Sequence, residues 1–363
     1  MKSDRPNPLA RMLALAGKET LQLLRDRATF GMLLGVPLVQ VLLFGFAIEL
    51  TPKSLPVTLV SSTPDIAVDF ENIIRDELGG VLVHRTDSMA SARRMLSRGE
   101  TVLVVSADVT PIRILVDATD PVLAAHALAA VERITRRLVA NESELAAFAD
   151  ETVVEKLFNP KLRSQPYLVS GLLGMILTMT LVMMSALTVA RERERGTLEG
   201  LVMLGVRPLE LAVGKLAPYL LLGIVQGLAV LMLAWLAFDV TVMGSPMLLA
   251  LASMVFYIAN LALGFLFSNL ANAQMPAMQM TFFFFLPSSL LSGFMFPFIA
   301  MPSWAQRIGD LLPLTHFLRV VRGLVFRDVD PWFVMRELLP ITIFATLVLV
   351  AALWRCGRQL RGA

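Results

Sequence analysis

The stretch LAPYLLLGIVQGLAVLMLAWLAF, from Leu216 to Phe238, decides the fold class. It contains no charged side chain, and about 20 apolar residues in a helix suffice to cross the hydrocarbon layer of a membrane. The apolar character continues beyond it, because Asp239 is the only formally charged residue between Leu216 and Ala300. We therefore expect a polytopic α-helical membrane protein.

The composition of the whole chain supports this class. Hydrophobic residues make up 56% of the 363 residues and charged residues only 17%, which is too apolar for a soluble protein to cover its surface. The single cysteine, Cys356, excludes an internal disulfide. The net charge is a modest +3 and the basic residues mostly flank apolar segments, so we interpret them as topology signals and expect no nucleic-acid partner.

Six segments are long and apolar enough, or nearly so, to be transmembrane helices. The first lacks a small-residue cleavage site and spans fully, so we interpret it as a membrane helix and not as a signal peptide. The six segments are residues 28–48, 167–190, 216–238, 247–268, 275–299 and 338–354.

The distribution of Lys and Arg predicts the orientation. Six basic residues precede the first span, five lie within 191–215 and three lie in the tail 355–363. The opposite side has none between residues 239 and 246 but five within 301–337. The balance places both termini in the cytoplasm.

Two segments outside the spans have amphipathic character. Residues 1–27 place Leu9, Met12 and Leu13 on one helical face and Arg11 and Lys18 on the other, which predicts a cytoplasmic helix anchored in the inner membrane surface. Residues 301–337 mix apolar and basic positions and contain three prolines. We expect an amphipathic helix or a re-entrant hairpin there, on the outer face.

Residues 49–166 are long enough to form a domain on the outer, periplasmic side, inserted between the first and second spans. Strands are predicted at 56–61, 81–84, 101–105 and 112–116, with helices at 65–78, 88–98 and 121–148. This pattern predicts a small α/β domain. His84 and His126 lie far apart without a partner, and Asp117 with Asp120 is more typical of a loop or helix cap than of a site.

The loop 191–215, RERERGTLEGLVMLGVRPLELAVGK, is the most informative segment for mechanism. We expect the second span to break at Gly196, a short helix to start at an N-cap on Thr197 and stop at Gly205, and Pro208 to open the third span. A short helix at 198–204 would offer a partner protein a rigid contact on the cytoplasmic side. A solvated turn with ordinary inside-positive charges is the alternative that periodicity leaves open.

The run Glu192 to Leu201 reads ERERGTLEGL. Four other blocks accompany it along the chain: LFNPKLRS at 157–164, RPLELAVGKL at 207–216, LPSSLLSGFMFP at 286–297 and LLPLTHFLRVVRG at 311–323. The run is similar to the signature of ABC type-2 transporter permeases, and together with the other blocks it resembles the bacterial multidrug-efflux kind with a large periplasmic loop.

The resemblance implies a bacterial inner-membrane subunit that pairs with a second permease and docks an ATP-binding-cassette ATPase, which would hold ATP and Mg²⁺. Relatives often work with a periplasmic adaptor and an outer-membrane channel, although nothing in this sequence requires them. Transferred onto matching positions, the ATPase-coupling residues are Glu192, Arg193, Glu194, Gly196, Thr197 and Glu199.

The residues themselves bear on the energy source. The spans carry no ionisable residue in their middle, whereas ion-coupled transporters usually need one. The Gly214-Lys215 pair lacks the earlier glycine and the following Ser or Thr of a phosphate loop, so we expect no nucleotide site, cofactor, metal site or catalytic residue in this chain. The uncharged polar residues that we assign to a substrate path, each more often a helix-helix contact, are Gln40, Gln226, Asn260, Gln279 and Ser289.

We therefore predict the permease subunit of an ATP-driven exporter with an apolar or amphiphilic substrate, such as a drug or lipid. A secondary transporter or channel would need an intramembrane charge or inverted repeat. A membrane-bound enzyme would need a His, Asp or Glu cluster, and no second ligand or base is apparent near any of the three histidines. A non-transporting sensor coupled to an ATPase is the remaining alternative, and a transport assay distinguishes it.

Overall fold

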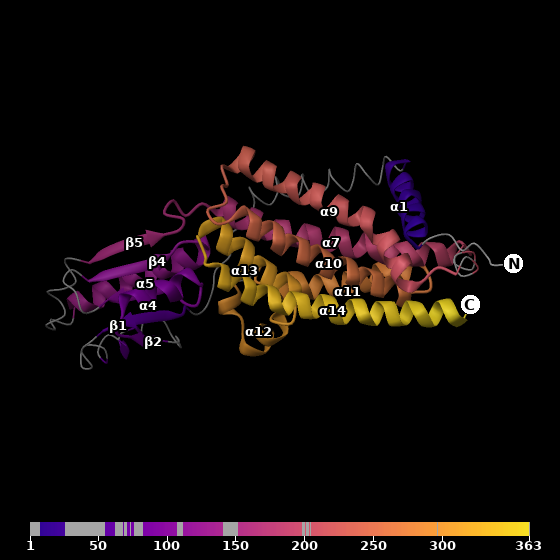
Figure 1. Cartoon of the computed structure of the whole chain (residues 1–363). Helices are drawn as coiled ribbons and strands as arrows, with labels where there is room; N and C mark the ends of the chain where they lie inside the picture. The colour runs from indigo at the N-terminus through magenta and orange to yellow at the C-terminus, as the bar shows by residue number, and fades with distance from the viewer. Residues whose placement is uncertain are drawn as a thin grey trace.

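The computed structural model describes residues 8–25, 55–61, 68, 71–72, 74–75, 83–106, 112–140, 152–197, 200, 203, 205–295 and 297–362. Long helices run side by side along most of the molecule, and a unit of strands and helices lies beyond one end of them (Figure 1). We call this the sheet end. Helix α1 (Pro8–Arg25) and the last turns of α14 (Pro331–Gly362) lie at the opposite end, which we call the α1 end (Figure 1).

The unit at the sheet end is built on a five-stranded sheet in the order β2-β1-β3-β4-β5. All pairs are parallel except β3 with β4. The strands are β1 (Val57–Val60), β2 (Val83–Thr86), β3 (Leu103–Ser106), β4 (Arg113–Asp117) and β5 (Val153–Leu157).

Alternation of side chains along the strands buries both faces of this sheet. Val57 and Leu59 of β1 belong to a core that includes α5 (Pro121–Ala140), whereas Val60 belongs to one that includes α4 (Met89–Ser97). The two helices therefore cover opposite faces. The four predicted strands are present, but the chain was not expected to form β5.

Five long helices form most of the helical part of the described structure: α7 (Ser164–Glu194), α9 (Pro208–Phe238), α10 (Pro246–Leu270), α11 (Gln274–Leu291) and α14. All of these except α11 are long and apolar enough to cross a membrane. The predicted spans at 167–190, 216–238, 247–268 and 338–354 lie within those four. The predicted first span, 28–48, lies outside the described residues.

The fifth predicted span, 275–299, is wrong in its extent. Helix α11 ends at Leu291, and Gly293 follows in the left-handed region at φ +86°. A side chain at this φ would be strained, and a Cβ atom there would lie 3.1 Å from the Phe298 Cβ. Apolar composition continues through the turn, which is why hydropathy alone extended the helix.

The segment 301–337 also differs from a helix lying on a surface. It forms α12 (Ser303–Gly309), α13 (Pro313–Phe326) and the first turns of α14. Every residue of α13 except Arg319 and Arg322 is buried, and the helix packs against α7, α10 and α14. Its 14 residues cover only about 21 Å at 1.5 Å per residue, so α13 is inserted among the longer helices without crossing the bundle.

Small and flat side chains set the packing of the bundle. The rings of Phe256 in α10 and Phe317 in α13 stack with centroids 4.0 Å apart. A Cβ atom on Gly264 of α10 would overlap Ser185 of α7, so glycine allows these two helices to approach closely. Helix α7 packs against α9, α10, α11 and α13. Its C-terminal end, at the α1 end of the molecule, is therefore held in place by its neighbours.

Candidate functional site

Helix α7 ends in a motif that fixes the direction of the following loop. The Gly196 N–H donates to the Arg193 carbonyl at 3.0 Å and the Thr197 N–H donates to the Glu192 carbonyl at 2.9 Å. With Gly196 at φ +71°, these are the two bonds of a Schellman C-cap. The predicted break at Gly196 is confirmed, and the hydroxyl of Thr197 also points back to Glu192.

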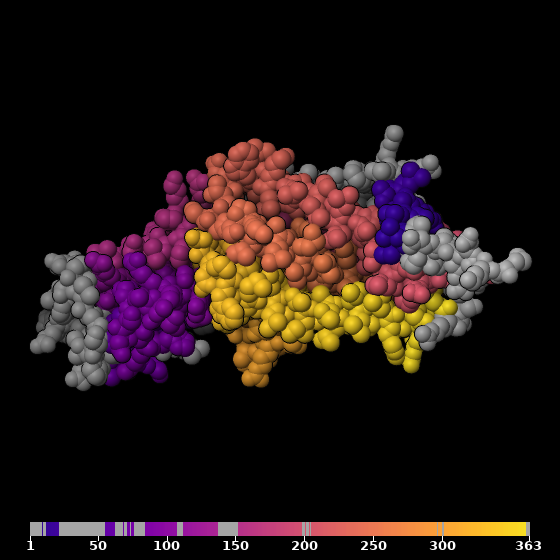
Figure 2. Space-filling view, in the orientation of Figure 1, coloured from indigo at the N-terminus to yellow at the C-terminus, as the bar shows by residue number. Residues whose placement is uncertain are grey.

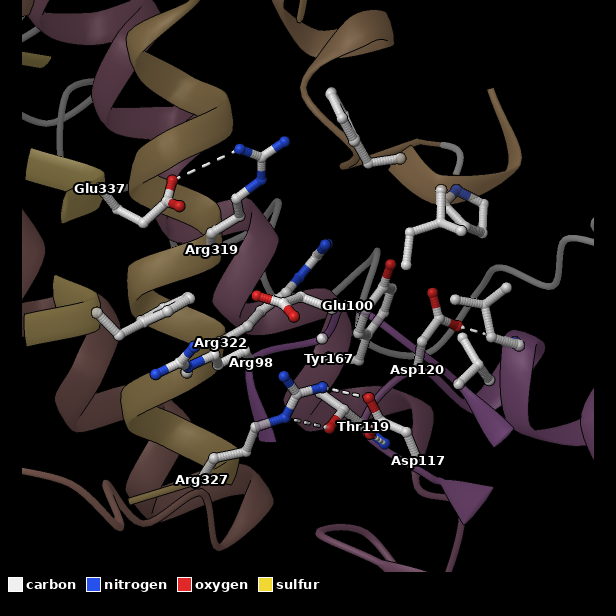
Figure 3. A pocket seen from close by; sticks show the side chains of 18 of the residues that line it. Arg98, Glu100, Asp117, Thr119, Asp120, Tyr167, Arg319, Arg322, Arg327 and Glu337 are labelled. Carbon is white, nitrogen blue, oxygen red and sulfur yellow. Dashed lines mark hydrogen bonds and ion pairs between the residues drawn. The ribbon is translucent and has the colours of Figure 1, made fainter. Parts of the chain in front are cut away.

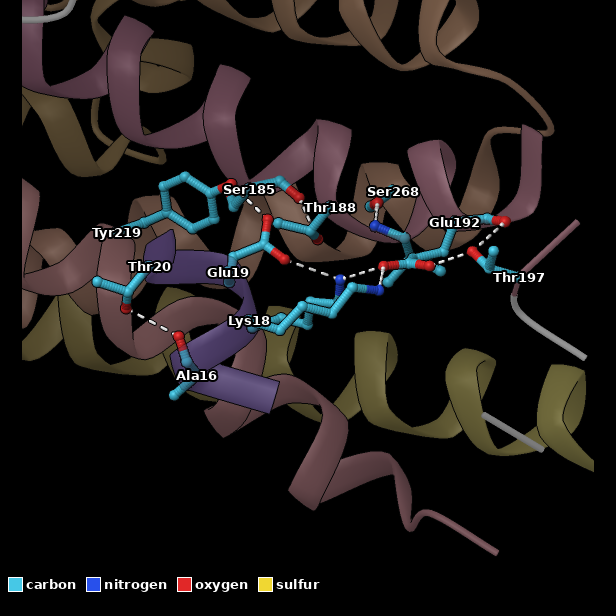
Figure 4. A network of polar contacts seen from close by, with 12 residues as sticks. Ala16, Lys18, Glu19, Thr20, Ser185, Thr188, Glu192, Thr197, Tyr219 and Ser268 are labelled. Carbon is cyan, nitrogen blue, oxygen red and sulfur yellow. Dashed lines mark hydrogen bonds and ion pairs between the residues drawn. The ribbon is translucent and has the colours of Figure 1, made fainter. Parts of the chain in front are cut away.

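A buried polar network joins α1, α7 and α9 at this end (Figure 4). The Lys215 ammonium, only 1% exposed, donates to Glu19 Oε2 at 2.9 Å and to Glu192 Oε1 at 2.7 Å. Glu192 Oε1 accepts a second hydrogen bond, from the Lys18 ammonium at 2.9 Å. The Tyr219 hydroxyl donates to Glu19 Oε1 at 2.7 Å. We call this the Lys215 network, whose members are Lys18, Glu19, Glu192, Thr197, Lys215 and Tyr219.

The network is electrically neutral, with two lysines and two glutamates in their ionised forms. Both carboxylates are more than nine-tenths buried, and a buried charge is tolerated only when it is paired and hydrogen-bonded. Each glutamate here meets an ammonium and a hydroxyl. Removal of any one charge would leave an uncompensated ion. Because Lys18 and Glu19 of α1 pair with Glu192 of α7 and Lys215 of α9, these ion pairs fix α1 against both helices.

Helix α1 reaches the network because α9 has a glycine beneath it. A Cβ atom on Gly214 would lie 2.8 Å from the Leu15 Cβ and 3.1 Å from the Met12 carbonyl oxygen. Leu15 and Glu19 are buried, whereas Leu9 and Leu13 are exposed. The amphipathic pattern predicted that α1 is an anchor and gave Glu19 no role. The available signal was that Glu19 is the one acidic residue of α1, among basic and apolar neighbours.

The other residues assigned to ATPase coupling make their described contacts inside this chain. Arg193 donates to the Ala271 carbonyl and is near Asn272, and Glu194 accepts from the backbone and side chain of Gln274 at 3.0 and 3.1 Å. They tie the end of α7 to the turn between α10 and α11. Glu199 lies outside the described residues. Gly200 and Met203, within the predicted short helix 198–204, are helical and exposed.

The four predicted substrate-path residues that the structure describes lie on α9, α10 and α11. Gln226 accepts from the Thr180 hydroxyl at 2.8 Å, and Ser289 donates to the Leu286 carbonyl at 2.9 Å. Asn260 donates to the Phe256 carbonyl at 2.8 Å, Gln279 is exposed, and Gln40 lies outside the described residues. Gln226 thus contacts another helix, as the more common interpretation expects, whereas Asn260 and Ser289 bond to carbonyl groups of their own helices.

One of the three histidines has a base beside it, which corrects the sequence analysis. His316 Nδ1 lies 2.7 Å from Glu337 Oε2, and its Nε2 lies 2.8 Å from the Asp310 carbonyl oxygen. The residues are 21 positions apart, so sequence proximity could not reveal the pair. Both ring nitrogens are engaged by the protein, and within the described residues no group of three or more His, Cys, Asp or Glu side chains could hold a metal ion.

Comparison with known proteins covers nearly the whole chain. The model of the ABC-2 family transporter protein matches residues 27–354. The probable multidrug ABC transporter permease YbhS of Escherichia coli is 28% identical over 331 residues, which cover 86% of this chain and 88% of that protein. YbhR of the same organism, which carries the same description, is 25% identical over 92% of this chain and 94% of its own length. ABC transporter G family member 20 of Dictyostelium discoideum is 22% identical over 97% of this chain and 52% of its own length.

Proposed function

This chain belongs to the ABC-2 family of transporter proteins, and from that premise we propose that it is the permease of an exporter powered by a separate ATPase subunit. As a transmembrane subunit of an ABC transporter, it supplies the route for the substrate and no enzymatic step. The substrate we propose is apolar or amphiphilic, such as a drug or a lipid. ATP and Mg²⁺ would bind the partner.

The Lys215 network carries the mechanistic part of the proposal. It lies at the same end as the α7–α9 loop and joins both flanking helices to α1 through buried charges. A push on that loop by an ATPase would therefore move α1, α7 and α9 together, because breaking buried ion pairs is costly. Glu192 then acts as a positioning residue for the loop, and Glu199 is the proposed point of contact with the ATPase.

The membrane arrangement follows the same reasoning. With residues 28–48 as a first span and the shorter α11 as the fifth, the chain would cross the bacterial inner membrane six times. The α1 end would face the cytoplasm, which agrees with the basic residues in α1, the α7–α9 loop and the tail. The sheet unit would then face the periplasm between spans one and two. A second permease subunit completes the proposed transporter, and an adaptor and outer-membrane channel are partners that the proposal does not require.

Energy dependence tests this function against a secondary transporter. Cells expressing the chain with its ATPase would be loaded with ethidium, Hoechst 33342 or a short-chain fluorescent phospholipid, and outward movement would be followed by fluorescence. We expect movement of at least one probe that persists when a protonophore collapses the proton gradient and stops when the ATPase is inactivated. Movement that stops with the protonophore and survives ATPase inactivation would refute an ATP-driven mechanism.

The same assay separates transport from sensing. A sensor coupled to an ATPase would form the complex and hydrolyse ATP, yet it would move none of the probes. The Glu199→Arg variant would lose transport together with ATPase stimulation. Glu132→Arg is the matched control, because Glu132 is an exposed glutamate on α5 of the sheet unit, paired with Arg136 of the same helix.

A further inference from the structure

A cavity of about 360 Å³ separates the sheet unit from the helices at the sheet end. Figure 3 shows Arg319 and Glu337 approaching it from the helices, and Asp117, Thr119 and Asp120 from the sheet unit. Pockets that hold small organic ligands are typically about 300 to 1,000 Å³. The cavity is therefore large enough for a small organic molecule, and its lining contains five arginines and five acidic side chains.

Two of the arginines that line the cavity are already neutralised. Arg327 pairs with Asp117 and also donates to Thr119 Oγ1 at 3.2 Å and to the Ser97 carbonyl at 2.9 Å. Arg319 lies 2.7 Å from Asp310 and 3.5 Å from Glu337. These pairs hold the sheet unit and α13 in place and offer no charge to a ligand.

Arg322 is different, because half of its guanidinium group has no acceptor. Its Nη1 donates to the Gly293 carbonyl at 3.0 Å, and its Cζ lies 4.0 Å from the centre of the Tyr167 ring. Its Nε and Nη2 are buried and have no hydrogen-bond partner in the part of the chain that the structure describes. Buried donors are rarely left unpaired, since an unmade hydrogen bond to a charged group is costly.

The geometry of the two unpaired donors indicates what would bind. Nε–H and one Nη2–H point in the same direction from one edge of the guanidinium. This edge can donate two parallel hydrogen bonds to the two oxygens of a carboxylate or phosphate group. Asp120 lies near enough to interact electrostatically with Arg322, but its Oδ1 already accepts the Val122 and Leu123 N–H groups at 2.9 and 3.2 Å. Burial raises the pKa of Asp120 above its ordinary value, while the hydrogen bond from Tyr167 and the charge of Arg322 act in the opposite direction.

The rest of the lining supplies two further arginines, outside the described ion pairs, and an apolar wall. Arg98 and Arg336 are exposed at the cavity and have no ion pair among the described residues, so they add positive charge, which Glu100 partly offsets. Leu123, Phe298 and Ile299 supply an apolar wall. We propose that this cavity is a binding site for an organic anion, whose carboxylate or phosphate group pairs with the Nε–Nη2 edge of Arg322. The site does not depend on transport or on the ATPase.

Binding to the purified full-length chain in nanodiscs tests the site. The probes are 4-phenylbutyrate, its neutral analogue 4-phenylbutanamide, and dihexanoyl phosphatidic acid, each followed by calorimetry without ATPase or ATP. We expect at least one of the two anions to bind ten-fold or more tightly than the amide. Binding of phenylbutyrate would identify a soluble anion as the ligand class, and binding of the phosphatidic acid alone would identify a lipid headgroup. Binding of neither anion above the amide would overturn the proposal.

Variants locate the bound anion. Arg322→Lys keeps the charge but loses the parallel fork, so we expect a ten-fold or greater loss of anion binding, and Arg322→Gln should abolish it. Arg93→Gln is the matched control, an exposed arginine on α4 that lies 3.8 Å from Glu155. Unchanged binding by Arg322→Lys and Arg322→Gln would overturn the assignment.

Arg336→Gln provides an independent test of the site if both Arg322 variants fail to fold. Its side chain is exposed, so folding should be unaffected. Loss of one nearby exposed charge should weaken anion binding about two- to five-fold at low salt, and less as salt rises. Equal binding by Arg336→Gln and wild type at low salt would contradict a site at this cavity.

Discussion

Replacement of Lys215 by Met removes the charge at the centre of the Lys215 network while keeping a long unbranched side chain. Glu19 would retain only the Tyr219 hydroxyl, and Glu192 would retain Lys18, whose side chain is 45% exposed, and Thr197. Breaking a buried ion pair by removing one partner typically costs about 3 to 5 kcal/mol. Because part of each carboxylate's environment survives, we expect a loss of about 3 kcal/mol in the free energy of unfolding.

A double-mutant cycle makes this prediction specific. Lys215→Met leaves two glutamates with one lysine, whereas Lys215→Met with Glu19→Gln leaves one glutamate with one lysine. The double variant is locally neutral again, so it should recover roughly 1 kcal/mol or more relative to Lys215→Met alone, within the range of coupling between contacting residues. Unfolding would be measured by denaturant titration in mixed micelles.

Lys161→Met is the control, since Lys161 is exposed and should change stability by less than about 0.5 kcal/mol. The reasoning is refuted if Lys215→Met behaves like Lys161→Met. It is also refuted if the effects of Glu19→Gln and Lys215→Met simply add, because the two side chains would then not interact energetically.

Three further predictions concern other parts of the fold. Gly264→Ala should destabilise the bundle by about 1 to 3 kcal/mol because its Cβ would overlap Ser185. Gly17→Ala on α1, with open space around it, should be neutral or stabilising by up to about 1 kcal/mol. Thermal unfolding midpoints that shifted in the same direction for both variants would contradict this packing. Arg327→Leu should destabilise the sheet unit because it leaves Asp117 buried without its partner, at a cost of about 3 kcal/mol or more. The effect should appear as faster hydrogen exchange in β4 and α5. Unchanged exchange would show that Arg327 does not stabilise the sheet unit. Arg85 and Arg75 lower the pKa of Glu71. The stability that these pairs contribute is therefore fully present above the ordinary Glu pKa and is lost as pH falls through the lowered value. If Glu71→Gln left the pH profile of the free energy of unfolding unchanged, the pairing would be contradicted.

Hydropathy predicted the long helices well because a lipid environment requires continuous apolar helices. The predicted spans lie within α7, α9, α10 and α14, which extend beyond them by up to eight residues. Hydropathy failed at α11, where composition stays apolar past Leu291 but the backbone turns at Gly293. Backbone conformation at one glycine decided the end of that helix.

Tertiary contacts account for the elements that the sequence did not predict. Strand β5 has the sequence VVEKL and gains its structure from pairing with β4, so local alternation gave a weak signal. Glu19 and Lys215 are 196 positions apart, and Arg322 meets Gly293 and Tyr167 only in the folded chain. The motif that indicated the family included Glu192, but its partners became visible only in three dimensions.

Co-purification of this chain with the ATPase encoded beside it tests the central claim most directly. Wild type, Glu199→Arg and the Glu132→Arg control would be compared for co-elution and for ATP hydrolysis relative to the ATPase alone. We expect a stable complex with altered hydrolysis for wild type and Glu132→Arg, and a loss of at least ten-fold in affinity for Glu199→Arg. A wild-type chain that binds no ATPase and leaves its hydrolysis unchanged would refute the assignment as an ATPase-coupled permease.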